Sequence, residues 1–288
     1  MQPGVERVLV PVGGHVVAAD VHLRDDGRLP VVFQHGILTS TEIASDLFVD
    51  PATESWVSLS LPGHHPGRLA AGTRAADVDA DLFADLTEAA LAHVLGDRRV
   101  AAVGWSTGGF AALSLAIRHP QRVAAVASLA GFADGRAISG SVAWLAWIAG
   151  GFAGAPGLRA GLWAGARLAW LHDAIVWSCT APATTVPSDR RARMRAAFAR
   201  HDPRKIATML AALPRLDLSA GLGGIASPVW IAAGGLDPLV PPAEARRLAA
   251  GIRDARLTIY RSGGHLFFEE WPGFHDDFAA WREGLPRA

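Results

Sequence analysis

The feature that most constrains the fold is a serine set between glycines, at the point where an apolar run meets a helical pattern. Gly104-Trp105-Ser106-Thr107-Gly108-Gly109 closes the apolar run Arg99–Trp105 and opens the segment Thr107–His119. In a Gly-x-Ser-x-Gly turn from strand to helix, side chains at the glycines would collide with neighbouring backbone. The turn exposes the serine hydroxyl at a helix N-terminus, where free N–H groups favour developing negative charge. The motif therefore predicts a nucleophilic Ser106 between a buried strand and a helix.

Short strand-like and helix-like segments alternate along most of the chain. Pro30–Gln34 and Val123–Leu129 are continuously apolar, as in strands of a buried parallel sheet. In Asp77–Leu95 the apolar residues recur at helical spacing. The other expected strands are Val5–Val12, His15–Leu23, Ser55–Leu61, Arg99–Trp105, Pro228–Ala233 and Leu257–Tyr260, and the other expected helices are Thr107–His119, Pro241–Ile252 and Leu266–Trp281. This alternation predicts an α/β protein with a mostly parallel twisted sheet flanked by helices.

The alternation pauses between about Phe132 and Leu216. This interval reads as helical and becomes polar and basic at Ser188–Arg204. It holds five of the ten tryptophans, namely Trp144, Trp147, Trp163, Trp170 and Trp177. A helical insertion that returns to the same sheet would lie over the carboxyl ends of the strands. We therefore expect residues 1–131 and 216–288 to form an α/β core and residues 132–215 to form a helical cap.

A serine hydroxyl is a poor nucleophile without a base, so the motif requires a histidine and an acid. Where this motif is catalytic on an α/β sheet, the partners follow in the order serine, acid, histidine. His265 lies on a glycine-rich loop after the last expected strand and is the predicted base. Asp237, which follows the strand Pro228–Ala233, is the predicted acid. Asp134, which follows Val123–Leu129, is the alternative because either loop could reach the histidine.

The loop Gln34–Leu38 is expected to supply half of an oxyanion hole. Gly36 lets the backbone approach closely, and the N–H of Ile37 could then point at the substrate oxygen. The second donor would be the N–H of Thr107, the residue after the nucleophile. His35 is expected to support this loop rather than to act as a base.

Substrate contacts are expected from both sides of the serine. The candidates are Leu38, Trp105, Trp144 and Trp147. Tryptophan supplies a large apolar contact area without demanding many hydrogen bonds, so these residues favour an apolar or aromatic substrate. The tryptophans of the insertion could equally pack the cap onto the core, and both uses can hold at once.

Taken together, these motifs resemble the α/β-hydrolase superfamily, as serine hydrolases with a helical cap. The matching pieces run in the family's order: His35-Gly36, Leu61-Pro62-Gly63-His64, Gly104-x-Ser106-x-Gly108, Asp237 and Gly264-His265. The form Gly-Trp-Ser-x-Gly-Gly is similar to small carboxylesterases. The resemblance implies a cofactor-free enzyme that cleaves small-molecule carboxylic esters through an acyl-enzyme. Thioester, lactone or carbon–carbon bond cleavage by the same triad stays open, as does a non-catalytic binding module.

Charge and cysteine content exclude other classes of protein. The chain has 27 Lys and Arg against 27 Asp and Glu, so its formal net charge of 0 argues against a nucleic-acid partner. Cys179 is the single cysteine and can form neither an internal disulfide nor a cysteine-based metal site. His64 and His65 are adjacent, and adjacent residues rarely face one ion together. We therefore expect no metal and no cofactor, and the oligomeric state stays open.

One uncharged stretch bears on membranes. Ala137–Leu158 is long enough to span a bilayer, but several glycines and Pro156 interrupt it. We expect a buried or lid helix there and no stable membrane span, with a membrane-attached lipase as the alternative. The segment Met1–Arg7 lacks the basic start and apolar run of a signal peptide, which favours a cytoplasmic protein.

Overall fold

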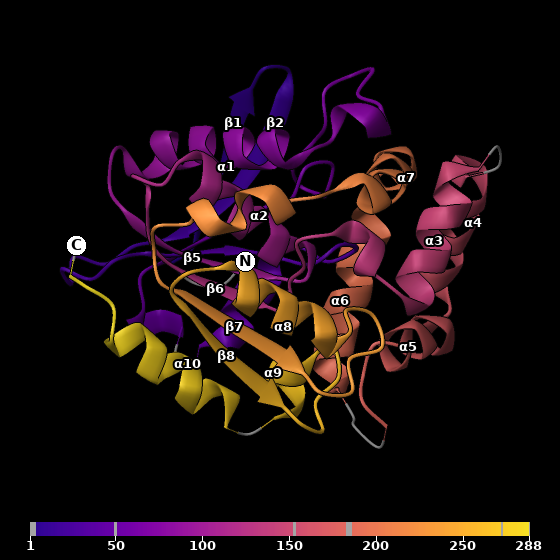
Figure 1. Cartoon of the computed structure of the whole chain (residues 1–288). Coiled ribbons are helices and arrows are strands. Elements are labelled where there is room, and N and C mark those ends of the chain that lie inside the picture. Colours follow the sequence, from indigo (N-terminus) through magenta and orange to yellow (C-terminus); the bar gives the residue numbers. More distant parts are fainter. Residues whose placement is uncertain (1–3, 49–50, 152–153, 183–185, 272, 288) are drawn as a thin grey trace.

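The computed structural model describes residues 4–48, 51–151, 154–182, 186–271 and 273–287 (Figure 1). Within these ranges, eight strands form a sheet in the order β1-β2-β4-β3-β5-β6-β7-β8. They are β1 (Glu6–Val12), β2 (His15–His22), β3 (Val31–Gln34), β4 (Trp56–Leu59), β5 (Val100–Trp105), β6 (Val123–Leu129), β7 (Val229–Gly234) and β8 (Ala255–Tyr260). The pairs β1–β2 and β2–β4 are antiparallel, and every pair from β4 to β8 is parallel. The predicted α/β fold with a mostly parallel sheet is confirmed.

Side chains of the central strands alternate between two packed layers. Val32 belongs to one layer, whereas its neighbours Val31 and Phe33 belong to the other, as the period of two in a strand requires. The first layer includes apolar residues of α1 (Ala80–Leu95), α2 (Thr107–Arg118) and α8 (Pro242–Gly251). The second layer includes residues of α9 (Phe267–Glu270) and α10 (Phe274–Glu283). Both faces of the sheet are therefore covered, which explains why the parallel strands are apolar throughout.

The prediction of one helix at Leu266–Trp281 is wrong. The structure has α9 and α10 there instead, with Trp271 between them in an extended conformation at φ −111° and ψ 112°. Trp271 precedes Pro272 in the sequence, and a residue before proline is disfavoured in the helical region.

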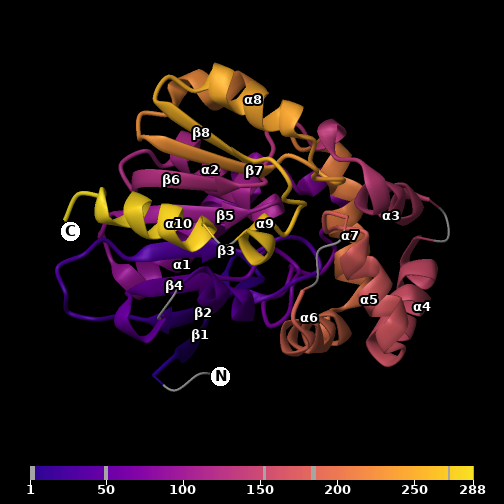
Figure 2. The ribbon, with the colours of Figure 1, turned by 90° about the horizontal axis from the view of Figure 1, so that it is seen from below.

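Between β6 and β7 the chain forms helices that gather at one end of the sheet (Figures 1 and 2). They are α3 (Gly140–Gly150), α4 (Gly154–Arg167), α5 (Ala169–Trp177), α6 (Ser188–Arg200) and α7 (Pro203–Ala212). The uncharged stretch Ala137–Leu158 is thus divided, because α3 ends at Gly150 and α4 begins at Gly154. In the described parts of the chain, no helix combines the length and the apolar character needed to cross a membrane.

Candidate active site

Ser106 lies on a strained turn between β5 and α2. Its backbone has φ 57° and ψ −119°, in the region of positive φ that residues other than glycine seldom adopt. A Cβ atom on Gly104 would overlap the carbonyl group of Gly108, and one on Gly108 would overlap the carbonyl group of Gln34. Both glycines are therefore required for the turn to pass between the neighbouring backbone segments. This is the geometry that the Gly-x-Ser-x-Gly motif predicted.

His265 and Asp237 meet at the ends of β8 and β7. His265 Nδ1 lies 2.8 Å from Asp237 Oδ2. Asp237 Oδ1 accepts hydrogen bonds from the N–H groups of Leu239 (2.8 Å) and Val240 (2.9 Å). The carboxylate side chain has no exposed surface. One oxygen of the carboxylate is thus held by the backbone, and the other holds the imidazole.

The backbone of His265 is fixed by two further contacts. Its N–H donates to the carbonyl oxygen of Cys179 (2.9 Å), and its own carbonyl oxygen accepts from Trp105 Nε1 (2.9 Å). The histidine is therefore tied both to the strand that carries the serine and to the segment after α5. Burial raises the pKa of the Cys179 thiol to about 11, so this nearby sulfur stays protonated and is a poor nucleophile.

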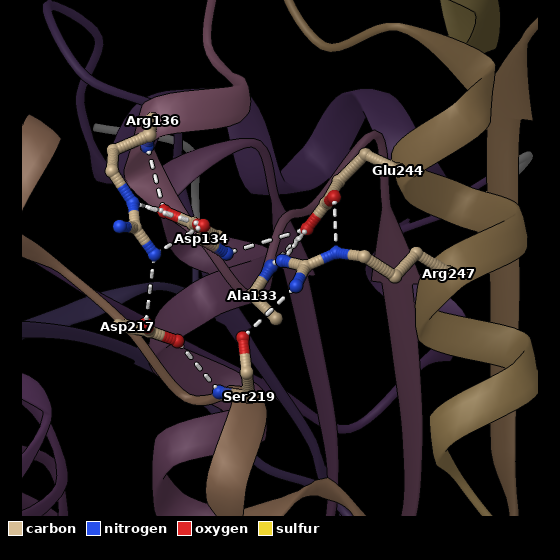
Figure 3. Close-up of polar contacts among 7 residues, drawn as sticks. All are labelled: Ala133, Asp134, Arg136, Asp217, Ser219, Glu244 and Arg247. Carbon is tan, nitrogen blue, oxygen red and sulfur yellow. Dashed lines mark hydrogen bonds and ion pairs between the residues drawn. The ribbon is translucent and has the colours of Figure 1, made fainter.

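The alternative acid, Asp134, is engaged elsewhere (Figure 3). Its carboxylate accepts from Arg136 Nε (2.9 Å) and Nη2 (2.8 Å), and the same guanidinium lies 3.3 Å from Asp217. The Arg136 hydrogen bonds hold the pKa of Asp134 below its usual range. Of the two candidates, Asp237 is the one that touches His265. The structure therefore excludes Asp134 as the partner of the imidazole.

The residues around Asp134 form a structural network. Glu244 on α8 accepts the N–H of Ala133 (2.8 Å), and both of its oxygens accept from Arg247 (2.8 Å). Arg247 also donates to Ser219 Oγ (3.0 Å), as Figure 3 shows. The buried carboxylate of Glu244 thereby ties α8 to the segment after β6, and its charge is compensated by Arg247.

The loop after β3 approaches the serine closely. A Cβ atom on Gly36 would lie 2.9 Å from Trp105 Cε3 and 3.3 Å from Ser106 Cβ, so glycine allows this contact. In the hydrogen bonds of the described residues, neither the N–H of Ile37 nor that of Thr107 has an acceptor within the protein. Both amides are buried next to the turn and are free to donate. Their use as an oxyanion hole stays a prediction.

Two buried histidines hold this loop. His35 Nε2 accepts the N–H of Leu61 (3.2 Å), so its Nδ1 carries the proton and donates to the Gly36 carbonyl (2.8 Å). His64 Nε2 accepts the N–H of Leu38 (3.1 Å), a residue held at φ 66°. Burial lowers the pKa of His35 to about 3 and holds the pKa of His64 well below its ordinary value. The expected supporting role of His35 is confirmed, and His64 shares it, a role that sequence reasoning did not assign.

A third histidine continues this row toward α7. The His201 ring lies 5.1 Å from that of His64, which in turn lies 5.2 Å from that of His35. His201 Nδ1 accepts the N–H of His65 (3.2 Å). Burial lowers the pKa of His201 to about 4. Among the described residues, no group of three or more His, Cys, Asp or Glu is arranged to hold a metal ion.

Ser106 and His265 open into an apolar cavity of about 80 Å³ under α3, α5 and α6. Its lining residues are Gly36, Ile37, Leu38, Thr39, Trp105, Ser106, Ser141, Val142, Leu145, His172, Ile175, Val176, Cys179, Met194, Phe198, Leu239, His265 and Leu266. Leu38 and Trp105 line the cavity, as expected for substrate contacts. Its walls combine loops after the strands with helices that are distant in sequence.

The structure places Trp144 and Trp147 elsewhere, which corrects the expectation that they contact the substrate. They are 61% and 76% exposed and are not among the lining residues. On α3 the cavity is lined by Ser141, Val142 and Leu145. At 3.6 residues per turn, the two tryptophans lie on a different side of the helix from these three residues.

His172 is a polar residue of the cavity wall that sequence reasoning set aside. It lies on α5, is 3% exposed, and its ring packs edge-on against Phe198 at 5.8 Å. Its buried Nδ1 has no hydrogen-bond partner within the described residues. Burial lowers the pKa of His172, so the ring is neutral near pH 7 and can offer Nε2 to a ligand. A single histidine in an apolar helix carries no sequence signal that would have identified it.

Comparisons with known proteins agree with this architecture. Residues 30–272 match the family model described as alpha/beta hydrolase fold. A putative carbamate hydrolase RutD of Variovorax paradoxus (strain S110) is 32% identical over 209 residues, 70% of either chain. A pimeloyl-[acyl-carrier protein] methyl ester esterase of Aromatoleum aromaticum is 31% identical over 221 residues, 74% of this chain and 81% of that protein.

Solved structures with the same fold include two described as esterases. A putative aryl esterase from Burkholderia cenocepacia superposes with a TM-score of 0.74 at 21% identity, covering 96% of this chain and 98% of the other. The esterase RhEst1 from Rhodococcus sp. ECU1013 gives a TM-score of 0.72 at 18% identity, covering 98% and 100%. At these identities the similarity concerns the fold.

Proposed function

The chain belongs to the α/β-hydrolase fold family, and from this premise we propose that it is a serine hydrolase that cleaves carboxylic esters. The observation that carries the proposal is the arrangement of three side chains that follow three strands. Ser106 lies on the strained turn and shares a cavity with His265, whose Nδ1 lies 2.8 Å from the buried carboxylate of Asp237. A nucleophile, a base and an acid that orients the base are what acyl transfer requires.

In the proposed reaction, His265 Nε2 takes the hydroxyl proton as Ser106 Oγ attacks the ester carbonyl carbon. The carbonyl oxygen becomes an oxyanion and accepts hydrogen bonds from the free N–H groups of Ile37 and Thr107. The imidazolium then gives its proton to the departing alcohol, which leaves an acyl group on Ser106. His265 then takes a proton from water as the water attacks the acyl carbon, and returns this proton to Ser106 Oγ as the bond to the serine breaks and the acid leaves. Asp237 holds the imidazole tautomer and stabilises its charge without taking the proton.

The cavity supports a compact, largely apolar substrate. Its volume of about 80 Å³ is small, and most of its lining side chains are aliphatic or aromatic. His172, neutral near pH 7, offers one hydrogen bond to a polar group of the substrate. We propose that residues 132–215 act as the cap, since α3, α5 and α6 contribute this part of the wall. The triad would then determine the reaction and the cap would determine the substrate.

Other acyl compounds could use the same triad. The relatives and neighbours include proteins described as a putative carbamate hydrolase and an enol-lactonase. In carbamates, lactones and thioesters the serine would likewise attack a carbonyl carbon and expel a heteroatom. A panel of aliphatic and aryl esters, thioesters, lactones and carbamates of graded acyl length distinguishes these substrates.

The test measures the turnover of that substrate panel by two variants, each of which lacks one serine hydroxyl of the cavity. Ser106→Ala should lower kcat by at least about 10⁴-fold, because the triad loses its nucleophile. Ser141→Ala, which removes another hydroxyl from the cavity wall, should retain turnover. Esterase activity that persists in purified Ser106→Ala at the parent level would overturn the proposal. A folded parent protein with no activity on any substrate would favour a binding module.

A further inference from the structure

The exposed tryptophans are confined to three consecutive helices. Five tryptophans on α3, α4 and α5 are between 55% and 76% exposed, and in the described parts of the chain no other tryptophan is exposed to this degree. We call this set the tryptophan face: Trp144, Trp147, Trp163, Trp170 and Trp177. Tryptophan is a large apolar side chain, so a cluster of this kind on a water-facing surface indicates an interaction site.

The rest of this surface is also unusual for a helix in water. Among the residues from Gly140 to Ser178 whose exposure the structure describes, the other exposed ones are glycines, alanines, Pro156, Leu168, Ser178 and two arginines. The arginines are Arg159 and Arg167, and among the described residues no carboxylate pairs with either. A helix that faces water normally carries charged and polar residues on its outer side. Here the outer side is apolar and its charges are positive.

We propose that the tryptophan face binds peripherally to the surface of a membrane that contains anionic phospholipid. Tryptophan favours the membrane–water interface because its ring is apolar and its N–H can still form a hydrogen bond. On α4 the Arg167 guanidinium lies 4.6 Å from the ring centre of Trp163, so a cation and an aromatic ring are presented together. Figures 1 and 2 both place α3 and α4 at the outer edge of the molecule, away from the strands, where a flat surface could reach them.

The distribution of charge favours an anionic surface over a second copy of the chain. On the helices of the tryptophan face the charged residues are Arg159, Arg167 and Asp173. Both arginines are exposed, whereas the Asp173 carboxylate lies 3.2 Å from Arg191 on α6. A symmetric pair that met through this region would bring two positive regions together. Anionic headgroups instead complement the arginines, and each basic residue near such a surface strengthens binding.

Two of these helices, α3 and α5, also form part of the wall of the cavity at Ser106. Val142 and Leu145 of α3, and His172 and Ile175 of α5, line it from the inner side. Binding through the tryptophan face would therefore hold this wall of the cavity at the lipid surface. The binding does not depend on the proposed chemistry, so Ser106→Ala should bind vesicles as the parent does.

The test measures co-sedimentation of the full chain with two kinds of vesicle. One kind contains phosphatidylcholine alone, and the other contains phosphatidylcholine with phosphatidylglycerol. We expect binding to the second kind, a blue shift of tryptophan fluorescence on binding, and weaker binding as salt rises. If the parent binds neither kind of vesicle, or binds both equally without salt dependence, the proposal is overturned.

Matched double variants locate the binding surface. Trp163→Ser/Trp170→Ser should lower the partition coefficient at least about tenfold, because binding scales with the apolar area inserted. Leu9→Ser/Leu23→Ser, which alters exposed apolar residues of the sheet region, should bind as the parent does. A far-ultraviolet circular dichroism spectrum and cooperative urea unfolding like those of the parent show that the tryptophan variant is folded. Unchanged vesicle binding by the folded tryptophan variant would overturn the proposal.

Two further measurements distinguish lipid binding by the tryptophan face from dimer formation through it. Arg159→Gln/Arg167→Gln should weaken binding to the anionic vesicles and reduce its salt dependence. If the parent instead forms a dimer that the tryptophan substitutions dissociate, and binds no vesicles, the face belongs to a second copy and the lipid proposal is wrong. Light scattering of parent and variant without lipid measures this outcome.

Discussion

Two regions of the molecule place tryptophan in opposite environments: Trp230 is buried in the sheet, and Trp147 is exposed on an inserted helix. Trp230 on β7 is 2% exposed, donates from Nε1 to Thr258 Oγ1 (3.0 Å) and stacks on Phe274 with ring centres 6.1 Å apart. Trp147 on α3 is 76% exposed. In the sheet, alternation assigns each side chain to a layer. In α3, which carries no charged residue and only one polar side chain, Ser141, the sequence does not mark which side faces outward.

The sheet and the inserted helices also contribute different parts of the proposed active site. Ser106, Asp237 and His265 follow β5, β7 and β8, so the sheet determines their positions. The opposite wall of the cavity comes from α3, α5 and α6. Under the proposed function, the loops that follow the strands would carry the chemistry and the inserted helices would select the substrate.

After Ser106→Ala, the largest effect is expected from a substitution of the acid. Asp237→Asn keeps an oxygen for the N–H groups of Leu239 and Val240 but no longer stabilises the imidazolium. We expect kcat to fall on the order of 10³–10⁴-fold while the fold is retained. Asp134→Asn, at the other acid that follows a central strand, should leave kcat near the parent value. Steady-state kinetics on one ester measures both, and the reverse ranking would contradict the assignment of the acid.

The contrast between the tryptophans predicts a large difference in stability. Trp230→Ala should lower the free energy of unfolding by about 3–5 kcal/mol, because it leaves a cavity and an unpaired Thr258 hydroxyl. Trp147→Ala should change it by less than about 0.5 kcal/mol, since the side chain is mostly in water. Urea unfolding followed by circular dichroism measures both values. A large loss in Trp147→Ala would mean that the tryptophan face is packed rather than exposed.

The buried histidine row predicts how stability depends on pH. The pKa of His201 is lowered by burial from 6.5 to about 4, so between these values the unfolded chain binds more protons than the folded one. The free energy of unfolding should therefore be highest above pH 6.5 and should decrease as the pH falls toward 4. Protonation of His201 in the unfolded chain should account for a decrease on the order of 3 kcal/mol. His35, with a pKa of about 3, adds to this slope.

His201→Asn isolates this contribution. The asparagine oxygen can replace Nδ1 as acceptor of the His65 N–H, but the side chain does not titrate. The loss of stability between pH 6.5 and 4 should therefore be smaller in the variant, as measured by urea unfolding at several pH values. His93→Asn, at an exposed histidine on α1, is the matched substitution and should retain the parent slope. A slope unaffected by His201→Asn would show that this ring is not buried in neutral form.

The smallest effect is expected from a glycine-to-alanine substitution in an inserted helix, which should stabilise the protein slightly. A Cβ atom on Gly161 in α4 would have no neighbour within 4 Å, so Gly161→Ala should stabilise the protein by about 0.5–1 kcal/mol through helix propensity. Gly108→Ala should instead destabilise it, because the added atom overlaps the Gln34 carbonyl. Thermal unfolding compares them. A gain in Gly108→Ala would contradict the description of the turn.

The sequence predicts a structural feature when the residues that determine it are close together along the chain. β6 was predicted at Val123–Leu129, as observed, because a buried parallel strand is apolar along its whole length. The turn at Ser106 was predicted because its steric requirement lies within a few residues. The hydrogen bond from Leu38 to His64 joins segments 26 residues apart and left no local pattern. Asp134 stayed an alternative because both acids follow central strands.

The proposed function requires that the hydroxyl of Ser106 be activated as a nucleophile. A fluorophosphonate probe reacts with such a serine and leaves a covalent adduct, which intact-mass measurement and peptide mapping can locate. We expect one adduct per chain on Ser106, with labelling much slower in Asp237→Asn and absent in Ser106→Ala, while Ser141→Ala labels as the parent does. A folded parent chain that acquires no adduct, or acquires it on another residue, would contradict the assignment of Ser106 as the nucleophile.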